Sequence, residues 1–272
     1  MITNTFVPDE RYPDATLTTY IHEYNKKEPS HRPAMIVCPG GGYHHLAGHE
    51  GEPIALYYLN AGMNTFILRY SIVEGAKNYA PLIEAALAVK HVREHAEEYG
   101  IDPEKIFICG FSAGGHLAAS CGILWNSKAV RDALGISDGI CPEGINRPNG
   151  LVLSYPVITA TEPTHAKSFR YLTGKEDPTE EEKKQFSLEY HVDETTPPVF
   201  LWHTFDDHVV PVRNALLLLN ALNEHGVPFE AHIYPHGSHG LAFANSETTG
   251  DSGIDPHIES WAKLSVEWIK QQ

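Results

Sequence analysis

The serine with the strongest chemical context is Ser112, which lies in the pentapeptide Gly110-Phe-Ser-Ala-Gly114. This is a Gly-x-Ser-x-Gly pattern, in which a nucleophilic serine stands on a sharp turn between a strand and a helix. An apolar run, Lys105–Cys109, precedes the pattern, and a helical stretch begins near His116. Side chains larger than glycine on either side of the serine would collide with that strand and helix. The context therefore predicts acyl-transfer chemistry with Ser112 as the nucleophile.

A nucleophilic serine needs a base and an acid, and two later loops offer them. One loop after a predicted strand holds the pair Asp206-Asp207, and the loop after the next predicted strand holds His236 and His239. A nucleophile turn of this form is followed along the chain first by its acid and then by its histidine. We predict Asp207 as the acid and His239 as the base, with Asp206 and His236 as the competing candidates.

Three consecutive glycines follow the apolar run Ala34–Cys38. Glycines allow backbone amides to turn toward a substrate, and such amides stabilise the negative charge that develops on a reacting carbonyl oxygen. We expect Gly41 and Gly42, together with Ala113 after the nucleophile, to form an oxyanion hole. The order of the two glycines in the sequence does not tell which of them is the main donor.

Short apolar runs alternate with amphipathic stretches along the chain. Predicted strands cover residues 34–38, 65–70, 105–109, 151–155, 199–202 and 230–234, and predicted helices cover 81–99, 116–125, 212–225 and 257–269. Nearly continuous apolar strands that alternate with helices indicate a mostly parallel sheet with helices on both faces, an α/β fold. An acid in a loop after such a strand can reach the top of the sheet, where the serine turn lies.

Residues 159–196 break this alternation. The stretch is polar, and Thr179-Glu-Glu-Glu182 has the form of a capping box at the start of a helix. We expect a small cap inserted over the strand ends. The chain contains no internal repeat and no linker long enough to divide it, so residues 1–272 are predicted to form a single domain with this insertion.

The composition excludes several other classes of protein. The chain has 272 residues and a formal net charge of −15, which disfavours binding to the phosphate backbone of nucleic acids. No leader sequence and no apolar run long enough for a bilayer is visible, so we expect no membrane association. None of the four cysteines forms a CxxC pair. We therefore predict that they are buried free thiols and that the protein is cytoplasmic, since the cytoplasm keeps thiols reduced.

Histidine is the one unusual count, at 17. His44, His45 and His49 lie close together in the sequence, but no cysteine accompanies them and no HExxH spacing occurs. We therefore predict no metal site and no organic cofactor. His116, one helical turn after Ser112, is expected to support the packing rather than to act as the base. The sequence is compatible with a homo-oligomer and does not specify one.

Several of these segments together resemble the α/β-hydrolase superfamily. They are Pro39-Gly-Gly-Gly-Tyr43, Gly110-Phe-Ser-Ala-Gly-Gly-His116, Trp202-His-Thr-Phe-Asp-Asp207 and Pro235-His-Gly-Ser-His-Gly240. Within the superfamily they look like the small bacterial carbohydrate-type esterases, relatives of acetyl xylan esterases and hormone-sensitive-lipase-like carboxylesterases. Pro39 replaces the histidine of the lipase-like loop, and the N-terminal segment is too short for lipase-like cap helices. Both departures favour the compact carbohydrate-esterase branch.

The resemblance implies a serine carboxylesterase that hydrolyses short acyl esters, acetyl above all, through an acyl-enzyme intermediate. Its expected partner is a small-molecule ester such as an acetylated sugar, and Tyr43 and Tyr155 are candidate residues of the substrate pocket. One alternative is an amide-cleaving relative, such as an arylformamidase or a small serine peptidase. Another is a non-catalytic binding protein on the same scaffold, but such proteins usually lose part of the triad.

Overall fold

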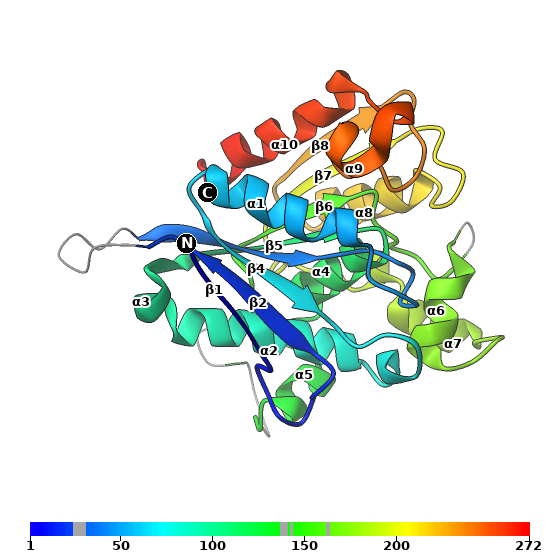
Figure 1. The fold of residues 1–272 in the computed structure, drawn as a ribbon. Coiled ribbons are helices and arrows are strands. Elements are labelled where there is room, and N and C mark those ends of the chain that lie inside the picture. Colours follow the sequence, from blue (N-terminus) through cyan, green and yellow to red (C-terminus); the bar gives the residue numbers. More distant parts are fainter. Residues whose placement is uncertain (24–30, 137–140, 142–143, 162–163) are drawn as a thin grey trace.

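The computed structural model describes residues 1–23, 31–136, 141, 144–161 and 164–272. Within these ranges eight strands form one sheet in the order β1-β2-β4-β3-β5-β6-β7-β8 (Figure 1). The strands are β1 (Ile2–Phe6), β2 (Thr16–Ile21), β3 (Arg32–Cys38), β4 (Asn64–Arg69), β5 (Ile101–Phe111), β6 (Gly150–Ser154), β7 (Val199–Thr204) and β8 (Phe229–Tyr234). β2 is antiparallel to both of its neighbours, and the remaining pairs are parallel. The predicted α/β fold with a mostly parallel sheet is confirmed.

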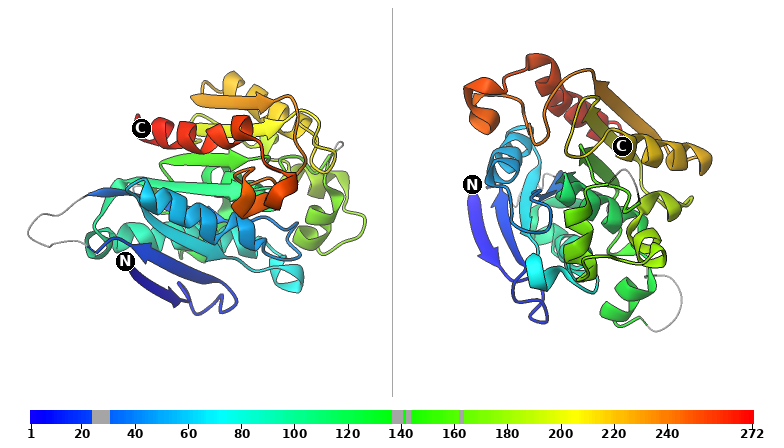
Figure 2. Two further views of the ribbon diagram at one scale, coloured as in Figure 1. Left: turned by 45° about the horizontal axis from the view of Figure 1, so that its top comes forward. Right: turned by 90° about the vertical axis from the view of Figure 1, so that its right-hand side faces the viewer.

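Helices cover both faces of this sheet (Figure 2). α1 (Glu52–Asn60) and α10 (Pro256–Ile269) pack on one face, and α2 (Ala80–Glu94), α4 (Ala113–Ile123) and α8 (Arg213–Glu224) pack on the other. In β3, Ile36 and Cys38 belong to the core beneath the second group, whereas Met35 and Val37 belong to the core beneath the first. Because both faces are buried, successive side chains of a central strand are mostly apolar, which explains the nearly continuous apolar runs in the sequence.

β5 occupies the middle of the sheet, between β3 and β6. Its last residue, Phe111, pairs with Ser154 of β6, and Gly110 pairs with Cys38 of β3. These parallel strands therefore end at the same edge. The glycine loop, Ser112 and the loop of Asp206 and Asp207 all follow strands that end there, which is where open parallel sheets bind their ligands.

The structure adds elements that the sequence pattern does not indicate. The hairpin β1–β2 lies at the edge of the sheet, where β1 is largely exposed and lacks the apolar run of a central strand. The helix predicted over 81–99 is divided into α2 and α3 (Ala96–Tyr99), because the backbone at His95 has φ −104° and ψ 19°. α4 begins at Ala113, earlier than the predicted start at His116.

Residues between β6 and β7 form α6 (Ala166–Thr173), α7 (Glu180–Phe186) and a 3₁₀ turn, Leu188–Tyr190. The capping box is present: the Thr179 hydroxyl accepts a hydrogen bond from the Glu182 amide, and the Glu182 carboxylate accepts one from the Thr179 amide. α6 packs against a second 3₁₀ turn, Val73–Ala76, and buries Phe169 in the main core. Figure 1 shows α6 and α7 beside the edge where the central strands end.

The short helices α5 (Lys128–Ala133) and α9 (Ser246–Thr249) complete the described secondary structure, with 3₁₀ turns at Gly48–Glu50 and Gly250–Ser252. Cys38, Cys109, Cys121 and Cys141 are buried free thiols. In the part of the chain that the structure describes, no helix is both long and apolar enough to cross a bilayer.

Candidate active site

Ser112 stands on a tight turn between β5 and α4, with φ 54° and ψ −116°. A Cβ atom on Gly110 would lie 2.0 Å from the carbonyl oxygen of Gly114, and one on Gly114 would lie 2.1 Å from the carbonyl oxygen of Cys38. Both distances are much shorter than a van der Waals contact, so glycine is required at each position. The turn holds Ser112 in a backbone conformation that is rare for a residue with a side chain. The strand–turn–helix context expected from the sequence is therefore present.

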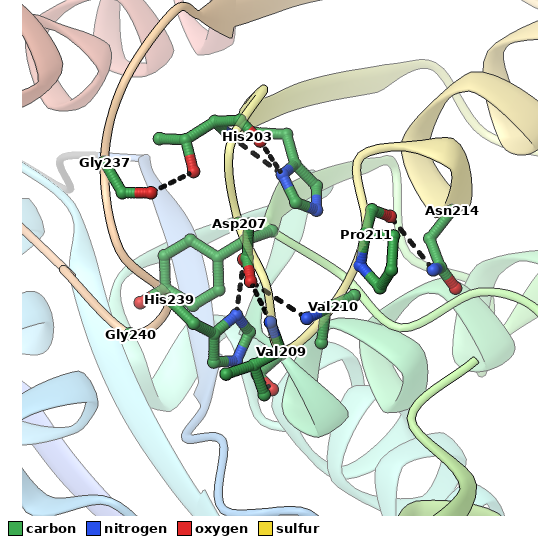
Figure 3. Close-up of polar contacts among 12 residues, drawn as sticks. His203, Asp207, Val209, Val210, Pro211, Asn214, Gly237, His239 and Gly240 are labelled. Carbon is green, nitrogen blue, oxygen red and sulfur yellow. Dashed lines mark hydrogen bonds and ion pairs between the residues drawn. The ribbon is translucent and has the colours of Figure 1, made fainter. Parts of the chain in front are cut away.

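A continuous chain of hydrogen bonds joins Ser112, His239 and Asp207. Ser112 Oγ lies 2.8 Å from His239 Nε2, and His239 Nδ1 lies 2.6 Å from Asp207 Oδ2. An ionised carboxylate only accepts hydrogen bonds, so Nδ1 carries the proton and Nε2 of the neutral ring accepts from the serine hydroxyl. Figure 3 shows the Asp207 carboxylate directed at the ring of His239. This arrangement can activate a serine for attack on a carbonyl carbon.

The Asp207 carboxylate is fully buried, and both of its oxygens accept hydrogen bonds. Its Oδ1 atom accepts hydrogen bonds from the backbone amides of Val209 and Val210 at 2.8 and 2.9 Å (Figure 3). Burial alone would raise the pKa of Asp207, but the hydrogen bond and charge of His239, together with the two amides, outweigh burial and lower the pKa. Asp207 therefore stays ionised and holds the imidazole in one orientation.

The competing candidates, Asp206 and His236, form a separate pair near the surface. Asp206 Oδ2 lies 3.1 Å from His236 Nδ1, and Asp206 Oδ1 accepts a hydrogen bond from the Gly237 amide at 2.7 Å. The hydrogen bond from His236 is the main cause of the lowered pKa of Asp206. The His236 side chain is 85% exposed, so this pair ties two loops together without reaching Ser112.

The predicted oxyanion donors border the same end of the sheet. Gly41 has φ 125°, and a Cβ atom there would lie 2.1 Å from the carbonyl oxygen of His45. The Gly41 carbonyl accepts hydrogen bonds from the amides of His44 and His45, which fixes the loop. Among the described residues, no protein group accepts a hydrogen bond from the amide of Gly41 or of Gly42. Ala113 is the first residue of α4, where helical amides lack intrahelical acceptors.

A cavity of about 700 Å³ opens beside Ser112. Its wall comes from the glycine loop and the residues after it, from the turn Val73–Ala76, and from α6 with the loop that follows. The histidines and charged side chains of the wall are His44, His45, His49, His165 and His239, Lys77, Lys167, Arg170 and Lys175, and Glu50, Glu74 and Glu176, and Ser112 and Tyr171 add two hydroxyl groups. A wall of this kind offers many hydrogen-bond donors and acceptors to a ligand that carries hydroxyl groups.

Tyr43 and Tyr155 do not line this cavity, contrary to the expectation from the sequence. Each is only 1% exposed, and each has a positive φ, 57° and 36°. The Tyr43 hydroxyl is hydrogen-bonded to His116 Nδ1 at 2.9 Å, and the Tyr155 hydroxyl donates to Glu50 at 2.7 Å. The chain turns at both tyrosines, and their side chains enter the core rather than the pocket.

Two residues near the site were missed by sequence reasoning. Glu50 is buried in a 3₁₀ turn and accepts a hydrogen bond from the amide of Gly40. His165 precedes α6, and its Nδ1 atom lies 2.9 Å from Ser168 Oγ. Burial, followed by the nearby charge of His239, lowers the pKa of His165. No motif marks either residue, since the chain has 35 acidic residues and 17 histidines.

His44 and His45 pack edge to face with ring centroids 5.8 Å apart. Over the described ranges, no group of three or more His, Cys, Asp or Glu side chains is arranged to hold a metal ion. His116 is buried, as expected, and its Nε2 atom is hydrogen-bonded to the carbonyl oxygen of Phe186.

Comparison with known proteins assigns the chain to a family. Residues 20–222 match the profile of the BD-FAE family. The chain belongs to this family. The matched region contains β3 to β7 with the glycine loop, Ser112 and Asp207, whereas His239 follows it.

Curated relatives of this BD-FAE protein are longer. The chain is 42% identical over 247 residues to endo-1,4-beta-xylanase B of Butyrivibrio fibrisolvens. The aligned region covers 89% of this chain and 37% of that protein. It is 31% identical over 225 residues to an acetylxylan esterase of Xylanibacter ruminicola, covering 80% of this chain and 42% of that protein. This BD-FAE protein therefore spans less than half of the length of either relative.

A solved structure similar to this BD-FAE protein is that of an acetyl ester-xyloside bifunctional hydrolase from Caldicellulosiruptor lactoaceticus. The two share 39% sequence identity with a TM-score of 0.80, covering 94% of this chain and 88% of that chain. The similarity extends over nearly the whole chain and supports the α/β-hydrolase fold described above.

Proposed function

We propose that this protein is a serine carboxylesterase that removes short acyl groups, acetyl above all, from carbohydrate esters. The observation that carries the proposal is the hydrogen-bonded chain of Ser112, His239 and Asp207 at the wall of a cavity lined largely by histidines and charged residues. The names of two similar proteins, an acetylxylan esterase and an acetyl ester-xyloside bifunctional hydrolase, support this choice of substrate.

The first half of the proposed reaction forms an acyl-enzyme. Ser112 Oγ attacks the acyl carbon while His239 Nε2 takes its proton, and the ionised Asp207 stabilises the resulting imidazolium. The amides of Gly41 or Gly42 and of Ala113 stabilise the negative charge on the carbonyl oxygen. His239 then gives the proton to the oxygen of the leaving alcohol as the bond between that oxygen and the acyl carbon breaks.

The second half of the reaction releases the acid. Water enters the position of the alcohol, His239 Nε2 takes one of its protons, and the resulting hydroxide attacks the acyl carbon. The tetrahedral intermediate is again held by the backbone amides, and it collapses as His239 returns the proton to Ser112 Oγ. The scheme uses only side chains, backbone amides and water.

In this proposal the described residues of the segment 159–196 form a cap over the alcohol part of the substrate. His165, Lys167 and Tyr171 of this segment belong to the cavity wall, which supports the assignment. Their polar groups suit the hydroxyl groups of a sugar better than a long hydrocarbon chain.

Release of acetate from acetylated xylo-oligosaccharides tests the proposal, with an aryl formamide as the competing amide substrate. We expect acetate release that saturates with substrate and is faster than hydrolysis of the formamide. Faster turnover of the formamide would assign the protein to the amide-cleaving relatives. A protein that hydrolyses neither substrate and does not react with a fluorophosphonate probe would be a binding protein on a hydrolase scaffold.

A further inference from the structure

Glu50 is a buried acid beside the proposed catalytic residues. Only 2% of the surface of Glu50 is exposed to solvent, and both of its carboxyl oxygens accept hydrogen bonds. Oε2 accepts from the Gly40 amide at 2.8 Å, and Oε1 accepts from the Tyr155 hydroxyl at 2.7 Å. Within the described ranges no lysine or arginine forms an ion pair with it, and His49 Nε2 lies 3.9 Å from Oε1. A buried carboxyl group without a close cation depends on its hydrogen bonds, so these two bonds must hold its position.

Tyr155 connects Glu50 to the loop of the proposed base. The Tyr155 hydroxyl accepts a hydrogen bond from the Ala242 amide at 2.9 Å, so its single proton is available to Glu50. Ala242 follows His239 in the same loop, and the ring of Tyr155 packs edge to face with the ring of His239 at a centroid distance of 5.0 Å. Displacing Tyr155 would therefore displace His239.

Gly40 connects Glu50 to the proposed oxyanion loop. It directly precedes Gly41, and a Cβ atom on Gly40 would lie 2.5 Å from Glu50 Oε2 and 3.1 Å from Ser112 Cβ. The carboxyl group, the glycine loop and the nucleophile turn are therefore in close contact. One carboxyl group bridges the loop that holds the oxyanion donors and the loop that holds the base.

We propose that Glu50 is a positioning residue that fixes the oxyanion loop relative to His239, which rests on the function proposed above. A negative charge does not favour an oxyanion, so the role of Glu50 is geometric. Oxyanion donors and a general base act only when both stand at hydrogen-bond distance from the reacting atoms. A carboxylate accepts from Gly40 and Tyr155 at once, whereas a glutamine presents one oxygen and one NH₂ group, which would face a donor.

Glu50→Gln tests this role through the rate at which a fluorophosphonate probe modifies Ser112, measured by peptide mass spectrometry. We expect the modification rate and kcat for p-nitrophenyl acetate to fall by about tenfold to 100-fold, the scale of a small misplacement of catalytic groups. KM should change by less than about threefold, because substrate binding does not depend on the oxyanion donors.

Tyr155→Phe removes the hydrogen bond from the Tyr155 hydroxyl to Glu50, which is one of the two bridges, and should also slow the modification of Ser112. The double variant should be no slower than Glu50→Gln, because both changes break the same connection.

Glu84→Gln is the matched control. Glu84 lies on α2, is also 2% exposed, and also accepts hydrogen bonds through both oxygens, from the amide and hydroxyl of Ser71. Both glutamine variants should lower the melting temperature, because each leaves a buried donor without its acceptor. Only Glu50→Gln should slow the modification of Ser112.

The outcomes separate this inference from the proposed function. Equal slowing by Glu84→Gln, or an unchanged rate in Glu50→Gln or in Tyr155→Phe, would overturn the positioning role. A wild-type protein that is modified at Ser112 but releases no acetate would contradict the acetylesterase assignment, while the rate comparison would still decide the role of Glu50. A wild-type protein that is not modified at Ser112 would overturn both.

Discussion

Asp207 Oδ2 lies 2.6 Å from His239 Nδ1, and this bond joins a fully buried carboxylate to an imidazole that borders the cavity. The two residues come from the loops after β7 and β8, which are neighbouring strands of the sheet. Because Nδ1 donates to Asp207, Nε2 is left to accept a proton from Ser112. The bond therefore determines the tautomer as well as the orientation of the proposed base.

Asp207→Asn should reduce kcat/KM for p-nitrophenyl acetate by about 10³-fold or more, because an amide in this position favours the wrong tautomer of His239. Asp206→Asn is the matched control, since Asp206 is bonded to His236 on the surface. The control should lose less than about tenfold, as expected for a change in loop packing. A larger loss in Asp206→Asn than in Asp207→Asn would show that the acid is assigned to the wrong residue of the pair.

The sequence predicted the residues whose role depends on a local pattern. Glycine is required at positions 110 and 114 because a Cβ atom there would lie 2.0 and 2.1 Å from backbone carbonyl oxygens. This steric requirement produces the Gly-x-Ser-x-Gly pattern around Ser112, which can be recognised in the sequence. The edge hairpin β1–β2 was not predicted, because an exposed edge strand does not need a continuous apolar run. The site residue Glu50 could not be predicted, because its partner Tyr155 is 105 residues away along the chain.

The direction of a side chain at a turn was also beyond sequence reasoning. Tyr43 and Tyr155 lie close to the cavity in the sequence pattern, next to the glycine loop and at a strand end. Their positive φ values and their hydrogen bonds to His116 and Glu50 place both rings in the core instead. Which way such a ring points depends on partners brought together only by the tertiary fold.

Folding stability should fall as the pH drops from about 6.5 to about 4, the interval in which buried neutral histidines resist protonation. Burial lowers the pKa of His116 and of His203 to about 4. Between these pH values the unfolded chain binds more protons than the folded chain, so the free energy of unfolding rises with pH. Each such histidine contributes a slope of up to about 1.4 kcal/mol per pH unit. Urea denaturation at several pH values measures this slope.

His116→Gln should flatten the slope, because it removes one of the groups that the fold keeps neutral. Its Nε2 atom donates to the carbonyl oxygen of Phe186, so Nδ1 accepts from the Tyr43 hydroxyl and has no proton in the folded protein. His225→Gln, at an exposed position, is the control and should leave the slope unchanged. An equal slope in wild type and His116→Gln would contradict the buried neutral state of His116.

Activity should fall steeply with the length of the acyl chain. The cavity wall carries five histidines and seven charged side chains, and its aliphatic side chains are those of Ala47, Val73 and Val209. A methylene group that finds no apolar contact forgoes roughly 0.8 kcal/mol of burial. In a series of p-nitrophenyl esters, kcat/KM should be highest for acetyl and propionyl and lowest for octanoyl. Equal or faster hydrolysis of the octanoyl ester would contradict the assignment to short acyl groups.

The central claim is that Ser112 is the nucleophile of an esterase, and the rate of acetate release by Ser112→Ala tests it most directly. The substitution removes one oxygen atom from a turn whose shape depends on Gly110 and Gly114, so the melting temperature should stay close to that of wild type. Acetate release from acetylated xylo-oligosaccharides should fall by about 10³-fold or more, as expected when a triad member is removed. A purified, folded Ser112→Ala protein that releases acetate at a rate near that of wild type would show that the nucleophile lies elsewhere.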